Sequence, residues 1–253
     1  MTKKIDRKEV SWGGDQEVLV AYMLSQLKEP YESTKSFFSF LNSIEDLNGS
    51  SIIDACCGGG SNLFFLRKNF NCGKLVGFDF QDDFLAIASS HAKKLNVPDI
   101  NFVNADIYNL PSTILNDKFD GAICLQTLSW LDDWRKALEQ LAKINTKWMA
   151  FSSLFYDGLL ESKTEVISYD KDQKIKHSAP YNVYSIPIVK EFLSMLGFID
   201  VVFKPFEIKI DIPRGDLNKI QTFTEKLEDG RRVQFSGPIV LPWYFLFARR
   251  QIP

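Results

Sequence analysis

The feature that most constrains this sequence is a short apolar stretch that runs into a cluster of glycines. Residues 51–56 have the pattern of a buried parallel strand, and Gly58, Gly59 and Gly60 follow before a stretch with helical spacing. Glycine lets the backbone turn sharply and lets a ligand approach without a Cβ in the way. In doubly wound sheets, ligands bind at the carboxyl ends of the strands. We therefore predict a nucleotide-type cofactor site at this turn.

Strands and helices alternate after the glycine-rich turn. Helices are predicted over 82–95 and 133–144, and further buried strands at 74–79, 100–103, 119–125 and 148–154. Repeated alternation with short connections is typical of parallel strands joined by helices. The predicted fold class is α/β, with a Rossmann-like, doubly wound, mostly parallel seven-stranded sheet, an N-terminal helical cap and inserted β-hairpins.

The segments on either side of this core predict the domain organisation. Two amphipathic helices come first, so residues 1–48 are expected to form a lid or cap. Residues 49–253 are expected to form the Rossmann-like domain. Turn signals flanked by strand patterns predict hairpins in two insertions, at about 156–184 and 211–242, which would cover the substrate.

Two acidic residues follow the second and third predicted strands. Asp79 comes 19 residues after Gly60, close to the spacing at which an acid reaches the hydroxyls of a ribose. Asp106 follows the third strand, where a carboxylate can accept a hydrogen bond from an exocyclic amine. The glycine pattern of dinucleotide-binding proteins needs a third glycine where this chain has Leu63, which argues against an NAD-dependent enzyme. A helix cap or a turn is the alternative role for each acid.

These motifs, in this order, resemble the class I S-adenosylmethionine-dependent methyltransferases over roughly residues 50–155. Their first motif is written D-x-G-x-G-x-G; Asp54, Gly58 and Gly60 match it, and Cys56 stands where the first glycine usually does. The resemblance implies S-adenosylmethionine as the cofactor. Asp79 would hold its ribose, Asp106 and Ile107 its adenine, and Gln126 would lie near the methyl group. The full set of predicted cofactor-binding residues is Asp54, Cys56, Gly58, Gly60, Asp79, Phe80, Asp106, Ile107 and Gln126.

The reaction needs an acceptor held against the donor, and an oxygen or nitrogen acceptor can also need a general base. His177, in the first predicted hairpin, and Gln126 are the candidate catalytic residues. Aromatic rings near the sheet edge could attract a sulfonium. Trp12, Tyr31, Trp130, Tyr181 and Trp243 are therefore the candidate substrate contacts. Ordinary core or loop positions are the alternative for all of them.

Composition narrows the acceptor and the partners. The net charge is −2, so a nucleic-acid substrate is not expected. The residues 235–244 look like a tail seen in methyltransferases of bacterial surface-glycan pathways, which favours a polar small molecule such as a sugar or capsule precursor. Protein or nucleic-acid methylation and a non-catalytic partner subunit are the alternatives.

The other expectations follow from what the sequence lacks. It has no CxxC pair and no histidines at zinc spacing, so no metal is expected. A signal peptide and an apolar run long enough to span a membrane are also lacking. Four reduced thiols then suit a cytoplasmic protein, without membrane partners, as a monomer or homodimer.

Overall fold

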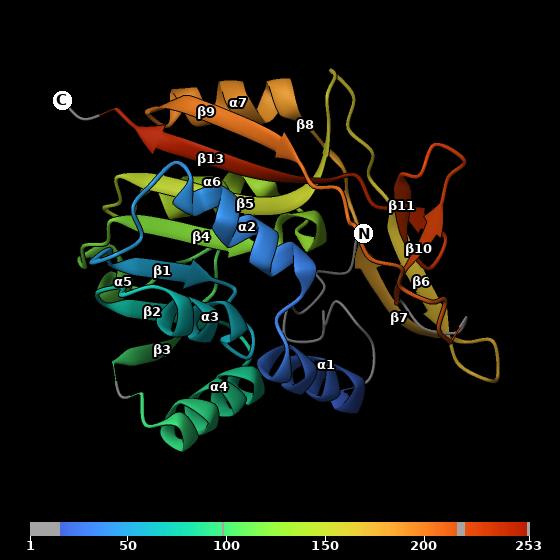
Figure 1. Ribbon diagram of the computed structural model, residues 1–253, viewed down its shortest axis with the longest axis horizontal. Coiled ribbons are helices and arrows are strands. Elements are labelled where there is room, and N and C mark those ends of the chain that lie inside the picture. Colours follow the sequence, from blue (N-terminus) through green and yellow to red (C-terminus); the bar gives the residue numbers. More distant parts are fainter. Residues whose placement is uncertain (1–15, 98, 217–220, 252–253) are drawn as a thin grey trace, which may run out of the picture.

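A computed structural model describes residues 16–97, 99–216 and 221–251. Its centre is one large sheet (Figure 1) with strand order β3-β2-β1-β4-β5-β13-β9. The strands of this path are β1 (Ile52–Ala55), β2 (Leu75–Asp79), β3 (Ile100–Asn104), β4 (Gly121–Leu125), β5 (Trp148–Tyr156), β9 (Phe198–Pro205) and β13 (Trp243–Arg250).

The pairing along this path confirms the predicted mostly parallel, doubly wound sheet. Neighbours from β3 to β5 pair in parallel, whereas β13 is antiparallel to both β5 and β9. An additional two-residue strand, β8 (Tyr184–Ser185), extends the sheet beside β5 and was not predicted. The carboxyl ends of β1, β2, β3 and β4 therefore meet at one edge, where the sequence predicted the site.

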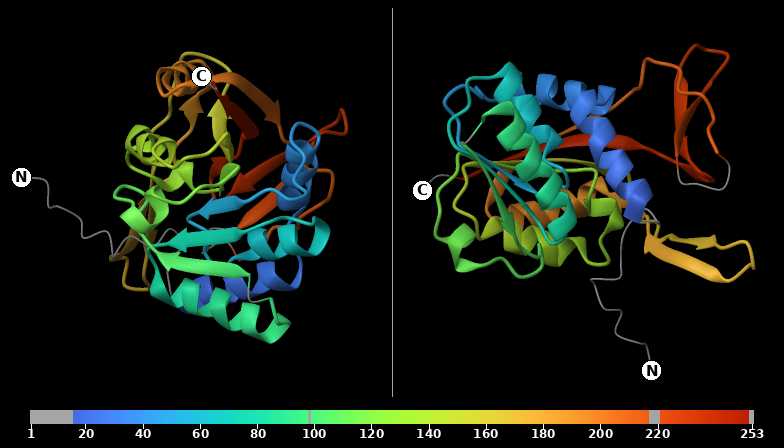
Figure 2. Two further views of the ribbon diagram at one scale, coloured as in Figure 1. Left: turned by 90° about the vertical axis from the view of Figure 1, so that its left-hand side faces the viewer. Right: turned by 90° about the horizontal axis from the view of Figure 1, so that it is seen from below.

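Helices cover both faces of the sheet, as the left view of Figure 2 shows. Successive side chains of β1 point to opposite faces of the sheet: Ile52 packs with α2 and α3, and Ile53 packs with α6 and α7. Because both faces are covered, β1 and β2 are buried along their whole length. The helices after β1 are α3 (Ser61–Asn69), α4 (Asp82–Leu95), α5 (Ser112–Leu115), α6 (Trp134–Ala142) and α7 (Ile186–Met195), with a short 3-10 turn at Leu128–Trp130.

The two N-terminal helices differ in how they are held. α2 (Glu32–Asn42) buries four apolar side chains against the sheet, Phe37, Phe38, Phe40 and Leu41. α1 (Gln16–Lys28) is held by a small cluster whose buried members are Leu19, Met23 and Phe84. α2 is thus part of the core, and α1 rests on the edge of the sheet beside α3 and α4.

Both predicted hairpins are present and lie beyond the carboxyl ends of the parallel strands (Figure 1). The first pairs β6 (Glu165–Tyr169) with β7 (Ile175–Pro180). The second pairs β10 (Thr222–Lys226) with β11 (Arg232–Ser236), and β12 (Ile239–Val240) adds a third strand. These insertions lie at the same end of the molecule as the glycine-rich turn. No helix among the described residues is long and apolar enough to cross a bilayer.

Candidate active site

The turn after β1 adopts the backbone conformation that its glycines permit. Gly58 and Gly60 have φ of 53° and 77°, and Gly60 caps the start of α3. Cys56, at the position of the family's first glycine, also takes a left-handed φ, of 55°. Such a conformation is uncommon for a residue with a side chain. Interaction with the neighbouring Cys124 thiol, together with burial, raises the pKa of the Cys56 thiol.

Asp79 joins the glycine-rich turn to the end of β2. Its carboxylate accepts hydrogen bonds from the backbone N–H of Gly58 at 2.9 Å and of Gln81 at 3.0 Å. The residue is 5% exposed, and burial raises the pKa of its carboxyl despite these bonds. The turn and the acid that were predicted to share one ligand are therefore in direct contact.

Asp54 lies in β1 beneath the same turn. Asn62 donates to Oδ2 at 3.2 Å, whereas the buried Oδ1 has no hydrogen-bond partner. Burial, which outweighs this bond, raises the pKa of Asp54 to about 8. A buried carboxylate oxygen without a partner is costly unless a ligand, a water or a proton satisfies it.

Phe80 directly follows Asp79, and Asp106 and Ile107 follow the neighbouring strand β3. The N–H of Ala105 donates to the Asp79 carbonyl at 3.0 Å, which holds the end of β3 against the end of β2. The carboxylate of Asp106 accepts from the N–H of Tyr108 at 2.9 Å, the turn role that was its alternative. Ile107 is buried and Phe80 is exposed. The carboxyl ends of β1, β2 and β3 thus bring these residues to one edge.

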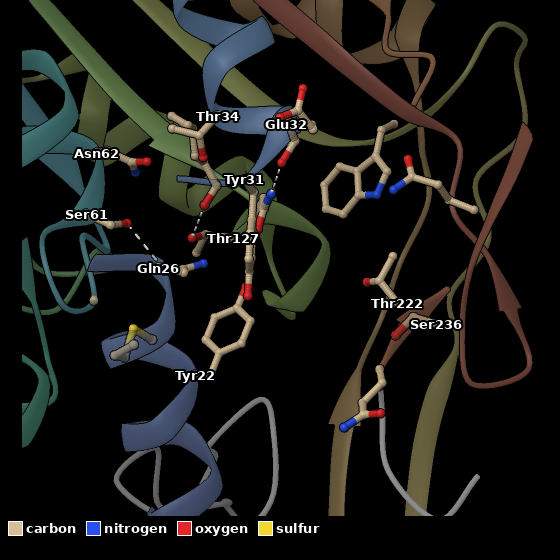
Figure 3. A pocket seen from close by; sticks show the side chains of 18 of the residues that line it. Tyr22, Gln26, Tyr31, Glu32, Thr34, Ser61, Asn62, Thr127, Thr222 and Ser236 are labelled. Carbon is tan, nitrogen blue, oxygen red and sulfur yellow. Dashed lines mark hydrogen bonds between the residues drawn. The ribbon is translucent and has the colours of Figure 1, made fainter. Parts of the chain in front are cut away.

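A cavity of about 560 Å³ opens at this edge, between α1 and α2 on one side and the second insertion on the other. Figure 3 shows Tyr22, Gln26 and Tyr31 facing it from the helical side, with Thr222 and Ser236 across from them. Of the predicted residues, it is lined by Cys56, Gly58, Gln126, Tyr31, Trp130, Tyr181 and Trp243. The acids Asp54, Asp79 and Asp106 are not among the lining residues.

Gln126 closes the floor of this cavity. It follows β4 with a φ of 57°, and its N–H donates to the Ser152 carbonyl at 2.7 Å. Its side-chain Nε2 donates to the Ser33 hydroxyl at 2.9 Å, which links the sheet to the first turn of α2. The side chain is therefore fixed at the edge, beside both the glycine-rich turn and the aromatic residues.

Aromatic side chains build the opposite part of the wall. Trp130 and Tyr181 stack with ring centroids 3.9 Å apart, and Tyr22 meets Tyr31 edge-on at 5.8 Å. Tyr181 and Trp243 are buried in one cluster with Leu154 and Leu241. Four of the five predicted aromatic residues thus face one space. The fifth, Trp12, lies outside the described residues.

The side chain of Met23 covers the glycine-rich turn from above. The N–H of Gly59 donates to its sulfur at 3.3 Å, and a Cβ on Gly58 would lie 2.9 Å from the same atom. Ser61 of α3 also reaches Gln26 of α1 at 3.4 Å (Figure 3). α1 is therefore seated directly on the turn.

His177 lies on β7, and it is not among the residues that line the cavity. Its Nε2 is buried without a hydrogen-bond partner, and burial lowers its pKa. Its catalytic role stays a prediction. Among the described residues, no group of three potential ligands could hold a metal ion.

Several lining residues were not predicted from the sequence. Tyr22 and Met23 carry a recognisable signal, because both lie on the apolar face of α1. The segment after β9 carried no signal that distinguished it from an ordinary strand. The missed residues are Phe206, Ile208, Ile210 and Ile212 of this segment and the polar residues Thr222, Gln234 and Ser236 of the second insertion.

Comparison with known proteins places this geometry in a known group of folds. Residues 52–146 match a family described as methyltransferase domain. The demethylmenaquinone methyltransferase of Lactococcus lactis is 28% identical over 103 residues, which are 36% of this chain and 41% of that protein. The chain spans between 25% and 53% of the lengths of the curated relatives that it matches.

Solved structures extend the likeness to most of the chain. Magnesium protoporphyrin IX methyltransferase from Synechocystis PCC 6803, determined with bound S-adenosylmethionine, superposes with a TM-score of 0.52 at 16% identity, covering 87% of this chain and 79% of that one. A chain from the Haloferax volcanii complex of the Trm112 methyltransferase activator superposes with a TM-score of 0.60 at 14% identity, covering 94% and 96%. At such low identities these likenesses establish the fold.

Proposed function

We propose that this chain, which carries a class I methyltransferase domain, transfers the methyl group of S-adenosylmethionine to an oxygen or nitrogen atom of a small-molecule acceptor. The observation that carries the proposal is the contact between the Gly58 N–H and the Asp79 carboxylate, 2.9 Å apart. It joins the two elements from which the family builds its adenosyl site.

The residues at the edge fit such a cofactor. Asp79 lies where its carboxylate could also accept bonds from ribose hydroxyls, and Asp106, Ile107 and Phe80 lie beside it for the adenine. The unpartnered Oδ1 of Asp54 would be satisfied through water by the amine of the donor's methionine portion. Gly58 and Gly60 would line that portion, and the Met23 side chain, which lies against Gly58, would have to move aside. The cofactor would supply a methyl carbon bonded to a positively charged sulfur.

The chain's own residues would position and shield the reactants. Gln126, held by Ser33, would orient the acceptor at the floor of the cavity. These residues would hold the acceptor's oxygen or nitrogen against the methyl group that the cofactor supplies; S-adenosylhomocysteine would leave, and the acceptor's proton would pass to a base or to water. Positioning of this kind can supply several kcal/mol toward such a displacement. α1 and the second insertion would exclude water.

The finer expectations from the sequence are part of this proposal. His177 would act as the general base if the β6–β7 hairpin moves toward the cavity. A sugar or capsule precursor is the acceptor that the C-terminal residues favoured. A cytoplasmic location and a monomeric or homodimeric state also stay predictions. Protein or nucleic-acid methylation is the alternative activity, and none of the described lining residues favours it.

Calorimetric titration with S-adenosylmethionine, S-adenosylhomocysteine and NAD tests the proposal. We expect both sulfur compounds to bind and NAD not to bind. Asp79→Ala should weaken S-adenosylhomocysteine binding by about 1–3 kcal/mol, which is roughly 5- to 150-fold. Asp172→Ala, at the exposed tip of the first hairpin, is the matched control and should bind normally. If the sulfur compounds do not bind the wild-type chain, the proposal fails.

A further inference from the structure

The described residues that line the cavity include almost no charge. None of them is lysine, arginine, histidine or aspartate, and the acid among them is Glu32. The carboxylate of Glu32 is already paired with Lys35 at 2.8 Å on α2. Among the described residues, the lining offers no side-chain cation that could replace the hydration of a phosphate group on the acceptor, and burying such an unpaired charge is strongly unfavourable.

One wall of the cavity is an apolar rail, formed by Phe206, Ile208, Ile210 and Ile212 in the extended segment after β9. All four residues line the cavity, although they belong to no regular strand and the chain bends at Ile210. Ile210 remains 46% exposed although it lies inside a folded segment. Ile208 is only 6% exposed, so the apolar surface that the folded chain leaves uncovered lies mainly at Ile210.

The rail is fixed at both ends. The N–H of Phe206 donates to the Trp243 carbonyl at 2.9 Å. At the far end, the N–H of Ile212 donates to the Thr224 hydroxyl at 2.8 Å, and the N–H of Thr224 donates to the Ile212 carbonyl at 3.0 Å. The apolar wall is therefore built into the fold, because backbone bonds hold it between β13 and β10.

The polar groups opposite the helices are neutral. Thr222 pairs with Ser236 across β10 and β11, and Gln234 is the next residue on the same face of β11. Together with Gln126 on the floor, they offer hydroxyl and amide groups to a ligand. The cavity thus combines apolar walls with a few uncharged hydrogen-bonding groups.

We propose that the methyl acceptor is an uncharged amphipathic molecule. Its apolar body lies between the rail and the stacked Trp130–Tyr181 pair, and its hydroxyl or neutral amine reaches Gln126. This inference rests on the proposed methyl transfer for the role of the ligand as acceptor. It predicts that acceptors carrying a phosphate or diphosphate, including nucleotide-linked sugars, bind more weakly than uncharged ones.

Matched aromatic probes test the charge preference. The full chain, saturated with S-adenosylhomocysteine, is titrated calorimetrically with 2-naphthol and with 2-naphthyl phosphate, which share one ring system and differ in charge. We expect 2-naphthol to bind at least about tenfold more tightly, corresponding to about 1.4 kcal/mol. Equal or tighter binding of 2-naphthyl phosphate, or tighter binding of glucose 1-phosphate than of 2-naphthol, would overturn the proposal.

A charge placed on the rail provides the second test. Ile210→Lys should weaken 2-naphthol binding about tenfold and strengthen 2-naphthyl phosphate binding, because the ammonium group would face the cavity. Ile199→Lys, at a similarly exposed position (50%) on β9 and not among the lining residues, should change neither affinity. Unchanged probe affinities in the folded Ile210→Lys variant would remove the rail from the ligand site.

The two proposals fail in distinguishable ways. If S-adenosylhomocysteine does not bind, the methyl-transfer proposal fails, and the same probe titrations without it still measure the preference of the cavity. If S-adenosylhomocysteine binds but the neutral probe shows no preference over the phosphate, the domain keeps its activity and the acceptor class is wrong.

Discussion

Removing the side chain of Met23 should strengthen cofactor binding. The sulfur of Met23 accepts a hydrogen bond from the N–H of Gly59 at 3.3 Å and lies against Gly58. The donor's methionine portion needs the same surface in the proposed function. Docked α1 and the cofactor therefore compete, and α1 must shift before the cofactor binds.

The size of this competition follows from what holds α1. Met23 is 5% exposed, in a cluster whose other buried members are Leu19 and Phe84. Truncation of a buried methionine to alanine costs about 2–5 kcal/mol, and a cluster this small favours the lower end, about 2 kcal/mol. The apparent affinity for the cofactor scales with the fraction of molecules in which α1 has shifted off the turn. A loss of about 2 kcal/mol of docking free energy therefore raises that affinity by at most about 30-fold. We expect a dissociation constant roughly tenfold lower.

Calorimetric titration of Met23→Ala with S-adenosylhomocysteine measures the effect directly. Leu24→Ala is the control, because Leu24 is on the same helix and 45% exposed. It should bind like the wild type. The melting temperature of Met23→Ala should fall by only a few degrees, at about 2–4 °C per kcal/mol of docking free energy lost, since the main core lies under α2 and the sheet. Weaker binding by Met23→Ala would refute the competition and make Met23 a contact of the bound cofactor instead.

Three further variants test individual residues. Asp54→Asn should flatten the pH dependence of the free energy of unfolding. The folded wild type retains a proton on Asp54 that the unfolded chain releases, so its stability falls as the pH rises from about 4 to about 8. In thermal scans at pH 8 the variant should therefore melt at a higher temperature than the wild type. His177→Ala should lower turnover and leave S-adenosylhomocysteine affinity unchanged, because its lowered pKa keeps the ring neutral at pH 7; full turnover would dismiss His177 as the base. Gln126→Ala should reduce kcat at least about tenfold in a methyl-transfer assay through lost positioning, with a smaller change in cofactor affinity; an unaltered kcat would contradict that role.

The proximity of the proposed donor-binding residues could be predicted because each part carries a local signal. A strand that ends in a glycine-rich turn fixes where Gly58 and Gly60 lie, and the parallel alternation brings Asp79 beside them. Only the sheet topology was needed to convert spacing along the chain into proximity. The structure added what spacing cannot give: the Asp79 carboxylate bonds the turn itself, and Asp106 bonds the backbone of its own turn.

The acceptor half could be predicted only in part, because its residues come from segments far apart in the sequence. The aromatic residues were recognised as unusual, but nothing showed that Trp130 would stack on Tyr181, 51 residues later. The rail has no turn signal in the sequence, so its alternating isoleucines resembled an ordinary strand. In the structure it has no regular strand partner. Its role depends on hydrogen bonds to β13 and β10, which are set by the tertiary fold.

The junction of α1 and α2 connects the two halves of the site. Tyr31 precedes the first residue of α2 and meets Tyr22 of α1, so the connection between the helices itself lines the cavity. α2 is fixed by completely buried phenylalanines, whereas α1 has only its small cluster. A shift of α1 that uncovers Gly58 would therefore pivot at this junction and also move Tyr22. Opening for the cofactor and reshaping of the acceptor cavity would then be one motion, which would couple the two binding steps without a separate lid.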